Sequence, residues 1–494
     1  MRILILDLDT LRPDHLGCYG YQRETSPNID RIAADGVRFE RYFCSDAPCL
    51  PSRASWITGR FGINSGLVGH GGTAADLRLE GAPRGFTSDF SRYCLTSIFR
   101  RAGLRTVSIS PFAERHSAWW FCAGFNEMHN TGKGGHESAE DITPTALDWI
   151  ERNAHEDNWL LHVNYWDAHA YYRAPESFGN PFESQPLPDR YTQEMIDSQA
   201  QTVGPSCRHE LNMYTSEAVD AYPRSVSAIN TMDDFRRHID GYDCGIRYMD
   251  SHIGQLLAAL EQKGVYDDLV VIVTADHGEN QGELGIFKEH ATADAITCRI
   301  PMIVRWPGVA KAGHVDRGLH YSLDLAPTVA ELLEQPPSEY WDGRSYAPSL
   351  TQGQDTGRDH LVLSQCAHVC QRSVLQDEWL WIRTWQDGFH LFEDEMLFDL
   401  AEDPMELASV AADQPERCSR ASQLLEAWHA EQMNKQCRLG QTASDPLWTV
   451  MSEYGPFHAQ HRGPNTPLPT YLKRLEATGR AEGAKRLREK YLIE

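Results

Sequence analysis

The chain has 494 residues, of which 41% are hydrophobic, enough for one large domain with a smaller partner or for two comparable domains. Its 46 Lys and Arg against 70 Asp and Glu give a net charge of −24, which disfavours binding to nucleic acid or to an anionic membrane surface. No apolar run reaches the ~20 residues of a membrane span and the apolar start is shorter than a signal-peptide core, so we expect a cytoplasmic protein with reduced thiols.

Apolar, strand-like runs alternate with helical patterns through the first 350 residues. Strands are expected at residues 2–8, 106–110, 159–165, 269–274 and 302–305. Amphipathic helices are expected near residues 29–34, 88–102, 141–153, 236–263 and 322–334. Uninterrupted apolar strands separated by helices are typical of a mostly parallel sheet with helices on both faces. The predicted fold class is therefore α/β, with ligand sites at the carboxyl ends of the strands.

Two parts of the chain depart from this alternation. Residues 171–237 are rich in Pro, Ser, Asp and Tyr, as in a long lid or binding loop. After about residue 350, short strands are expected at residues 361–364, 372–376, 379–384 and 396–400, with helices at 421–433 and from about 470. These strands predict a smaller carboxy-terminal antiparallel sheet with a helix. We therefore divide the chain into a larger domain, 1–355, and an α+β subdomain with a tail, 356–494.

Acidic and histidine side chains follow three of the predicted strands. Asp9 follows the first strand, the segment ending in His169 follows another, and Asp276 and His277 follow a third. Any one of them alone reads most simply as a helix cap or a turn residue in solvent. The carboxyl ends of parallel strands, however, lie at one edge of a sheet. We therefore expect these side chains to converge there.

The most informative segment is C-L-P-S-R-A-S-W-I-T-G-R, residues 49–60. A cysteine on a proline-containing turn at the start of a helix faces amino-terminal NH groups, where negative charge is favoured. Arg53, one turn further on, adds a fixed positive charge. As a bare thiol, Cys49 would therefore have a lowered pKa and be a candidate nucleophile. Most of the other cysteines are expected to be small buried hydrophobic residues.

The motif C-x-P-S-R followed by x-x-x-T-G-R resembles the signature of the type I sulfatases, in the alkaline phosphatase superfamily. The runs D-T-L-R-P-D-H-L-G-C-Y-G (9–20) and T-S-P-N-I-D-R-I-A (25–33) resemble the family's opening strand, loop and helix. V-T-A-D-H-G-E (273–279) with G-I-F-K (285–288) resembles its second metal segment and lysine, and residues 299–308 and 396–404 resemble later landmarks. The resemblance covers about residues 2–410, without the 171–237 segment.

The resemblance implies that residues 1–355 form the catalytic domain and that a maturation enzyme, formylglycine-generating or equivalent, oxidises Cys49 to formylglycine. It also implies one divalent cation, held by Asp9, Asp276, His277 and the modified Cys49. Such an oxygen-rich set suits a hard ion, so Ca²⁺ is the first choice and Mg²⁺ the second.

The resemblance also assigns catalytic roles. It implies that Arg53 anchors the formylglycine hydroxyl, that Lys288 binds sulfate oxygens, and that His169 protonates the leaving oxygen. The family's Lys-x-His segment is not recognisable, and S-P-F-A-E-R-H-S-A-W-W stands at residues 110–120. In that segment we expect His116 to fill the histidine role and Arg115 to replace the lysine's charge.

The chain also departs from the family at several positions. Many sulfatases have a second Asp directly after the first, where this chain has Thr10; Asp7 either compensates for it or is a buried acid. His70 is expected to be a solvent-exposed loop histidine rather than part of the pocket rim. Residues 171–237 and 454–463 are expected to border the pocket. Residues 236–238 either bind a second anionic group of the substrate or are a surface helix start.

The implied mechanism is in-line attack on sulfur by the hydrated formylglycine. Preorganised positive groups stabilise the charge on the sulfonyl oxygens, and His169 gives a proton to the departing alcohol. The second hydroxyl, deprotonated by His116, then expels sulfate and restores the aldehyde. A serine lacks that second hydroxyl, which is why the chemistry needs an oxidised cysteine.

We therefore expect a sulfuric ester hydrolase. Because a charge of −24 disfavours a long polyanion, the expected substrate is a small sulfated molecule, a mono- or oligosaccharide of the glycosaminoglycan type. Two alternatives stay open: a phosphonate or phosphate ester hydrolase of the same superfamily, and a non-catalytic protein that binds a sulfated ligand. No nucleic acid or membrane partner is expected.

Overall fold

An eight-stranded sheet forms the centre of the molecule in a computed structural model that describes residues 1–78, 89–453, 455–456 and 467–492. Its strands are β1 (Arg2–Leu8), β2 (Val37–Phe43), β4 (Arg105–Ile109), β5 (Glu127–His129), β6 (Trp159–Tyr165), β7 (Leu269–Thr274), β10 (Met302–Arg305) and β11 (Val315–Tyr321). They run in the order β11-β2-β10-β7-β1-β6-β4-β5. β10 is antiparallel to both of its neighbours, and the other pairs are parallel. The predicted mostly parallel α/β sheet is confirmed.

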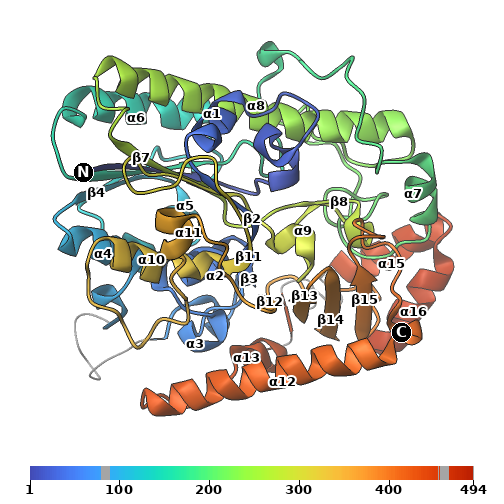
Figure 1. Ribbon diagram of the computed structural model, residues 1–494. Helices are drawn as coiled ribbons and strands as arrows, with labels where there is room; N and C mark the ends of the chain where they lie inside the picture. Colours follow the sequence, from blue (N-terminus) through green and yellow to red (C-terminus); the bar gives the residue numbers. More distant parts are fainter. Residues whose placement is uncertain (79–88, 454, 457–466, 493–494) are drawn as a thin grey trace.

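Helices cover both faces of this sheet (Figure 1). One face carries α1 (Pro27–Ala34), α6 (Ala139–Asn153) and α8 (Met232–Gln262), and the other carries α2 (Cys49–Thr58), α4 (Leu95–Arg101) and α10 (Leu325–Leu332). The long helix α8 begins at a capping box, in which the Thr231 side chain accepts a hydrogen bond from the Asp234 backbone NH. Among the described helices, none is long and apolar enough to cross a bilayer.

The central strands are buried along almost their whole length. Every residue of β6 and β7 is buried, as are six of the seven in β1. Because helices exclude water from both faces, these strands are predominantly apolar in the sequence, and the polar side chains within them, such as Asp7, His162 and Asn164, are buried. β1 lies between β6 and β7 in parallel register, with Leu8 opposite Tyr165 and Asp7 opposite Thr274. This register brings the three polar strand ends to one edge, as predicted.

Three strands of the large sheet were not predicted: β2, β11 and β5, whose three residues E-M-H are too few to show a pattern. β2 reads V-R-F-E-R-Y-F and β11 reads V-D-R-G-L-H-Y, so charged side chains interrupt both apolar patterns. β11 is an edge strand and β2 is its neighbour. Half-exposed positions of this kind accept charged side chains without loss of stability. The sequences of β2 and β11 therefore lack the apolar run by which a buried strand is predicted.

A second sheet of five strands lies at the carboxy-terminal end. It consists of β12 (Leu361–Gln365), β13 (Cys370–Gln376), β14 (Trp379–Gln386), β15 (Glu395–Asp399) and the two-residue β3 (Asp46–Ala47). The four carboxy-terminal strands pair antiparallel, and α12 (Pro415–Arg438) runs beside them (Figure 1). The predicted smaller sheet with a helix is confirmed. β3, just before Cys49, joins β12 in parallel, so the two predicted parts share this sheet; their boundary stays a prediction.

The segment 171–237 is largely irregular, as predicted, but it has an apolar cluster of its own. It contains the short helix α7 (Gln193–Ser198) and, from Met232, the first turns of α8, and it packs against β9 (Phe287–Glu289). The cluster consists of Tyr191, Met195, Ile196, Leu211, Ile229, Phe235, Ile239, Phe287 and Met405.

The remaining elements are α3 (Gly62–Ser65), α5 (Phe112–Arg115), β8 (Asn280–Gln281), α9 (Ala295–Cys298), α11 (Ala347–Gln352), α13 (Pro446–Ser452), α15 (Pro467–Ala477) and α16 (Ala481–Tyr491).

Candidate active site

Four of the predicted residues form one buried group at the edge of the large sheet. Asp9 follows β1, Asp276 and His277 follow β7, and Cys49 is the first residue of α2. One ligand atom from each of the four lies within 4.8 Å of the others. The predicted cation ligands therefore converge from three separate parts of the chain. We call them the four-residue group.

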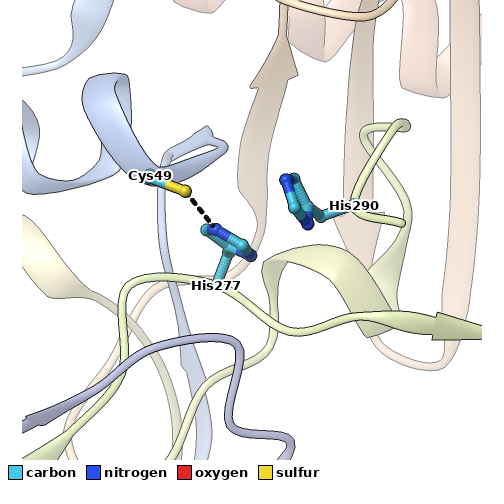
Figure 2. Close-up of side chains that lie close together, drawn as sticks. All are labelled: Cys49, His277 and His290. Carbon is cyan, nitrogen blue, oxygen red and sulfur yellow. Dashed lines mark hydrogen bonds between the residues drawn. The ribbon is translucent and has the colours of Figure 1, made fainter. Parts of the chain in front are cut away.

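The hydrogen bonds of this group fit a bound divalent cation. Asp9 is fully buried and its Oδ1 accepts no hydrogen bond, which is costly for a carboxylate unless a cation binds it. His277 Nδ1 donates to the Gly278 carbonyl at 2.7 Å, so its Nε2 carries the lone pair and faces Cys49 Sγ at 3.1 Å (Figure 2). A backbone acceptor on the other ring nitrogen is the usual support of a metal-binding histidine.

Arg53 is the positive charge inside this group. Its guanidinium donates to both carboxylate oxygens of Asp7, at 2.8 and 3.0 Å, and also to Asp276 Oδ2. Its Nη2 lies 3.0 Å from Asp9 Oδ2. One guanidinium thus faces three buried carboxylates, and the remaining negative charge favours a bound cation.

Asp7 and Asp276 both pair with Arg53, but their pKa values shift in opposite directions. Burial alone would raise the pKa of Asp7, but the Arg53 guanidinium and then His162 lower it to about 2. Burial raises the pKa of Asp276 well above its ordinary value, and although Arg53 opposes this, Asp9 and Asp7 add to it. Asp7 lies outside the four-residue group. It is therefore the buried acid of the two alternatives, paired with Arg53.

The expected reactivity of the bare Cys49 thiol is wrong. Burial, followed by the nearby charges of Asp9 and Asp276, raises the pKa of this thiol well above its ordinary value. The start of α2 and Arg53 do favour a thiolate, but desolvation and two carboxylates outweigh them. Without a cation the unmodified thiol stays protonated and is a poor nucleophile.

Both predicted catalytic histidines lie beside the four-residue group. His169 Nδ1 donates to the Ala170 carbonyl, and its Nε2 lies 3.9 Å from Asp9 Oδ1. His116 Nε2 is buried and has no hydrogen-bond partner. Burial, then Arg115 and Arg53, lowers the pKa of His116 to about 3, and burial followed by Arg115 places that of His169 well below its ordinary value. Both imidazoles are therefore neutral near pH 7.

Arg115 lies close to these histidines but points to other partners. Its guanidinium lies over the Trp166 ring, 4.8 Å from the centroid, and donates to the Gly135 carbonyl at 3.1 Å. Its charge contributes to the low pKa of both histidines.

The structure does not bring Lys288 into the four-residue group. Its ammonium donates to the Asn212 side chain, to Ser225 Oγ at 2.8 Å and to the Val226 carbonyl at 3.3 Å, and it lies over the Tyr171 ring. Burial lowers its pKa to about 8. All of these partners belong to the segment 171–237, which therefore engages the lysine in this conformation.

Sequence reasoning missed two histidines of the site and misjudged a third. The His290 ring lies 4.2 Å from that of His277 (Figure 2), and the His368 ring lies 5.6 Å from His290. His70 Nε2 accepts the Leu50 backbone NH at 3.2 Å, so the expectation of a solvent-exposed loop histidine was wrong. His290 lies two residues after Lys288 of the motif, which is a weak sequence signal for a site residue. No sequence motif surrounds His368.

The remaining expectations have mixed outcomes. Thr10 lies at the site, because its backbone NH donates to Asp276 Oδ1 at 3.2 Å and its hydroxyl is buried without a partner. Arg236 donates to the Gln185 carbonyl and Arg237 pairs with Asp234 on the first turns of α8, as in the alternative of a surface helix start. His238 is buried. Of residues 454–463, only 455–456 lie within the described part.

The chain is similar to known proteins along most of its length. The family model described as Sulfatase matches residues 2–335, and that described as N-sulphoglucosamine sulphohydrolase, C-terminal, matches residues 282–434. The chain is 24% identical over 459 residues to the multifunctional alkaline phosphatase superfamily protein PehA of Trinickia caryophylli, covering 78% of this chain and 86% of that one. It is 25% identical over 474 residues to N-acetylgalactosamine-6-sulfatase of Homo sapiens, covering 86% and 84%.

A solved structure shares the fold. It is a protein in complex with its substrate D-glucosamine-2-N,6-O-disulfate, with a TM-score of 0.68 and 18% identity, covering 88% of this chain and 98% of that chain.

Proposed function

The chain belongs to the sulfatase family, in the alkaline phosphatase superfamily, and on that premise we propose that it removes sulfate from a small sulfated saccharide through a formylglycine made from Cys49. The observation that carries the proposal is the convergence of Asp9, Cys49, Asp276 and His277 in one buried group. Catalysis of ester hydrolysis needs a nucleophile held against positive charge. This group contains both the residue proposed as the nucleophile, Cys49, and the residues proposed to bind the cation.

The four-residue group would hold the divalent cation. Ca²⁺ is the first choice and Mg²⁺ the second, since two carboxylates and an oxidised residue 49 supply oxygen ligands. When bound, the cation polarises an oxygen and offsets negative charge on the transferred group. It would also keep Asp276 ionised, which burial and two neighbouring carboxylates otherwise oppose.

Residue 49 supplies the nucleophile in this proposal. A hydrated formylglycine has two hydroxyl groups, of which one takes the sulfonyl group and the other provides the electrons that later expel sulfate. Arg53 is fixed by Asp7 and Asp276, so its charge stays beside residue 49. The raised pKa of the unmodified thiol argues against Cys49 itself as the nucleophile, and the proposal therefore assigns this role to the oxidised residue.

The two neutral histidines suit opposite proton transfers. His116 keeps a free, unprotonated imidazole near pH 7 because its pKa is about 3, and it can accept the proton of the second hydroxyl. His169 is also neutral, but a sulfate ester bound beside it would favour the charged imidazole and raise its pKa. Substrate binding would thus prepare His169 to donate a proton to the leaving alcohol.

Burial implies when the cysteine is oxidised. Cys49 is 2% exposed, and all ten residues of α2 are buried. A maturation enzyme that recognises this segment needs it in an extended, accessible form. We therefore propose that the maturation enzyme acts before the chain completes its folding.

The substrate class rests on charge and on the relatives. A net charge of −24 repels a long polyanion, whereas a single sulfate reaches the positive groups of the pocket. N-acetylgalactosamine-6-sulfatase supports a sulfated saccharide. Because another relative is a multifunctional protein of the alkaline phosphatase superfamily, we keep hydrolysis of a phosphonate or phosphate ester as the alternative function.

One experiment separates these functions. The enzyme is assayed on position-defined sulfated mono- and disaccharides of the glycosaminoglycan type, on nitrophenyl sulfate and on a phenyl phosphonate ester, with free sulfate and nitrophenol or phenol as readouts. Cys49→Ser serves as the control and should show no turnover. We expect sulfate release from at least one saccharide with a kcat/KM above that for the phosphonate ester. A higher kcat/KM for the phosphonate ester, or ligand binding without turnover, would contradict the proposal.

A further inference from the structure

A second cluster of metal-binding side chains lies next to the four-residue group. It consists of Glu289 at the end of β9, His290 after it, and His368 in the turn between β12 and β13. One ligand atom of each lies within 4.8 Å of the other two. All three residues are at most 8% exposed, so water does not stabilise a charge there.

The two imidazoles face one carboxylate. Glu289 Oε1 lies 3.3 Å from His290 Nε2 and 3.9 Å from His368 Nε2. The two rings are perpendicular, with an interplanar angle of 89° and centroids 5.6 Å apart. Among the described residues, these imidazoles are the basic groups within 4 Å of the Glu289 carboxylate. A buried carboxylate with two neutral nitrogens beside it is typical of a metal ligand set.

His290 also links this cluster to the four-residue group. Its ring lies 4.2 Å from that of His277, and its Nδ1 is buried without a hydrogen-bond partner. Figure 2 shows the two imidazoles side by side next to Cys49. A ligand bound to the second cluster would therefore lie beside the nucleophile.

One glutamine holds both ligand-bearing turns in place. Gln365 of β12 is fully buried; its Nε2 donates to the His290 carbonyl at 2.9 Å, and its Oε1 accepts the His368 backbone NH at 3.0 Å. The two turns are 78 residues apart in sequence, and a single side chain fixes their separation. Such outer-shell support is typical of a preorganised metal site.

We propose that Glu289, His290 and His368 bind a second divalent cation beside the four-residue group. Two imidazoles and one carboxylate prefer a borderline ion such as Zn²⁺ or Co²⁺ over Ca²⁺. Three protein ligands leave at least one coordination position open for water or for a substrate oxygen. The second site does not depend on the oxidation of Cys49 or on the identity of the sulfated substrate.

Metal stoichiometry tests this site without reference to activity. The full-length protein is stripped with a chelator, dialysed against Co²⁺ and freed of excess metal; bound Co²⁺ per chain is then measured by mass spectrometry of the metal, and its visible absorption is recorded. The variants are Glu289→Gln and His368→Ala, with His155→Ala on an exposed turn as the control. Asp276→Asn removes a ligand of the other group. Circular dichroism establishes that each variant is folded.

We expect two equivalents of Co²⁺ in the wild type and in His155→Ala, and one in Glu289→Gln and His368→Ala. Asp276→Asn should lose a different equivalent, so that its double variant with His368→Ala binds none. No bound Co²⁺ in the wild type, or a single equivalent that Asp276→Asn loses and His368→Ala retains, would overturn the proposal. Retention of two equivalents by either second-cluster variant would also overturn it. If a variant fails to fold, the wild-type stoichiometry and the remaining variant still decide the result.

Discussion

Arg53 holds the acidic side of the site together. It pairs with Asp7 and Asp276 and lies 3.0 Å from Asp9, entirely inside the protein. A buried guanidinium with these contacts cannot be replaced without leaving carboxylates unpaired. The invariable charge and planar shape of arginine suit this position better than lysine would.

We predict that Arg53→Met lowers the free energy of unfolding by about 3–5 kcal/mol, because it leaves buried carboxylates without a partner. The measurement is urea unfolding at pH 7. Arg105→Met is the matched control, since the Arg105 side chain is 43% exposed in its pair with Glu127 and should cost less than ~1 kcal/mol. Equal losses in the two variants would contradict this account of Arg53.

His116 is predicted to act as a base. Replacement by Asn should lower kcat by about 10²–10⁴-fold and leave the melting temperature nearly unchanged, because His116 Nε2 has no hydrogen-bond partner to lose. Steady-state kinetics and thermal melting measure the two effects. A kcat within twofold of the wild type would exclude the role.

The pH dependence follows from the same residue. Burial lowers the pKa of His116 to about 3, compared with about 6.5 for a free imidazole. A base must be unprotonated, so His116 stays active as the pH falls from 7 to about 4, and its protonation should not reduce kcat/KM in that range. An acidic limb near pH 6.5 that disappears in His116→Asn would contradict this.

At the residue scale, the sequence motifs predicted which side chains meet at the sheet edge, but not every contact. Asp9, Cys49, Asp276 and His277 could be predicted because each lies in a motif next to a strand end or helix start. The partners of Lys288 could not, because Asn212 and Ser225 belong to an irregular segment. The positions of His290 and His368 likewise depend on how distant turns meet.

At the scale of elements, burial decided which strands could be read from the sequence. The predicted ranges of β6, β7 and β10 agree with the structure to the residue, because both faces of these strands are covered and every side chain is apolar or packed. β2 and β11 carry charges on half-exposed positions. The two-residue β3 is too short to leave any pattern.

The segment 171–237 depends on its small apolar cluster. Ile196 of α7 is fully buried there, and the same segment supplies the partners of Lys288. We predict that Ile196→Ala lowers the free energy of unfolding by roughly 2–5 kcal/mol and makes this segment more sensitive to protease. Glu194→Ala, exposed on the same helix, should change stability by less than ~0.5 kcal/mol. Equal stability of the two variants would show that the cluster is not a structural core.

At the scale of the whole molecule, a strongly acidic protein surrounds a site at which we propose that bound cations supply positive charge. The net charge is −24, whereas Arg53, Arg115 and the proposed cations concentrate positive charge at the sheet edge. The negative potential of the protein surface and the positive charge of the site act on different parts of a substrate. A single sulfate meets the local charge, and the rest of a long polyanion meets the acidic surface.

This arrangement predicts a salt effect of unusual sign. Raising NaCl from about 20 to 200 mM shortens the Debye length from roughly 20 Å to under 10 Å. Screening should therefore lower the KM for a sulfated disaccharide severalfold, and lower it further for a long sulfated polymer. Initial rates at several salt concentrations test this. A KM that rises with salt, or faster turnover of the polymer than of the disaccharide, would show that attraction dominates.

The fold class and the site's place in it could be predicted from the sequence, since both depend on strand burial and on motif order. The sharing of the smaller sheet between the two predicted parts, through β3 and β12, depends on tertiary pairing. The same pairing places His368 beside the catalytic edge. Long-range contacts of this kind carry no local pattern.

The central claim is that residue 49 acts as a formylglycine, and mass spectrometry of the peptide containing it tests this most directly. The enzyme is purified to constant specific activity, digested and analysed with and without an aldehyde-trapping hydrazine. We expect the aldehyde form of residue 49 in a fraction that rises with specific activity across preparations, and none in Cys49→Ser. Fully active enzyme with only an unmodified thiol at Cys49 would contradict the account.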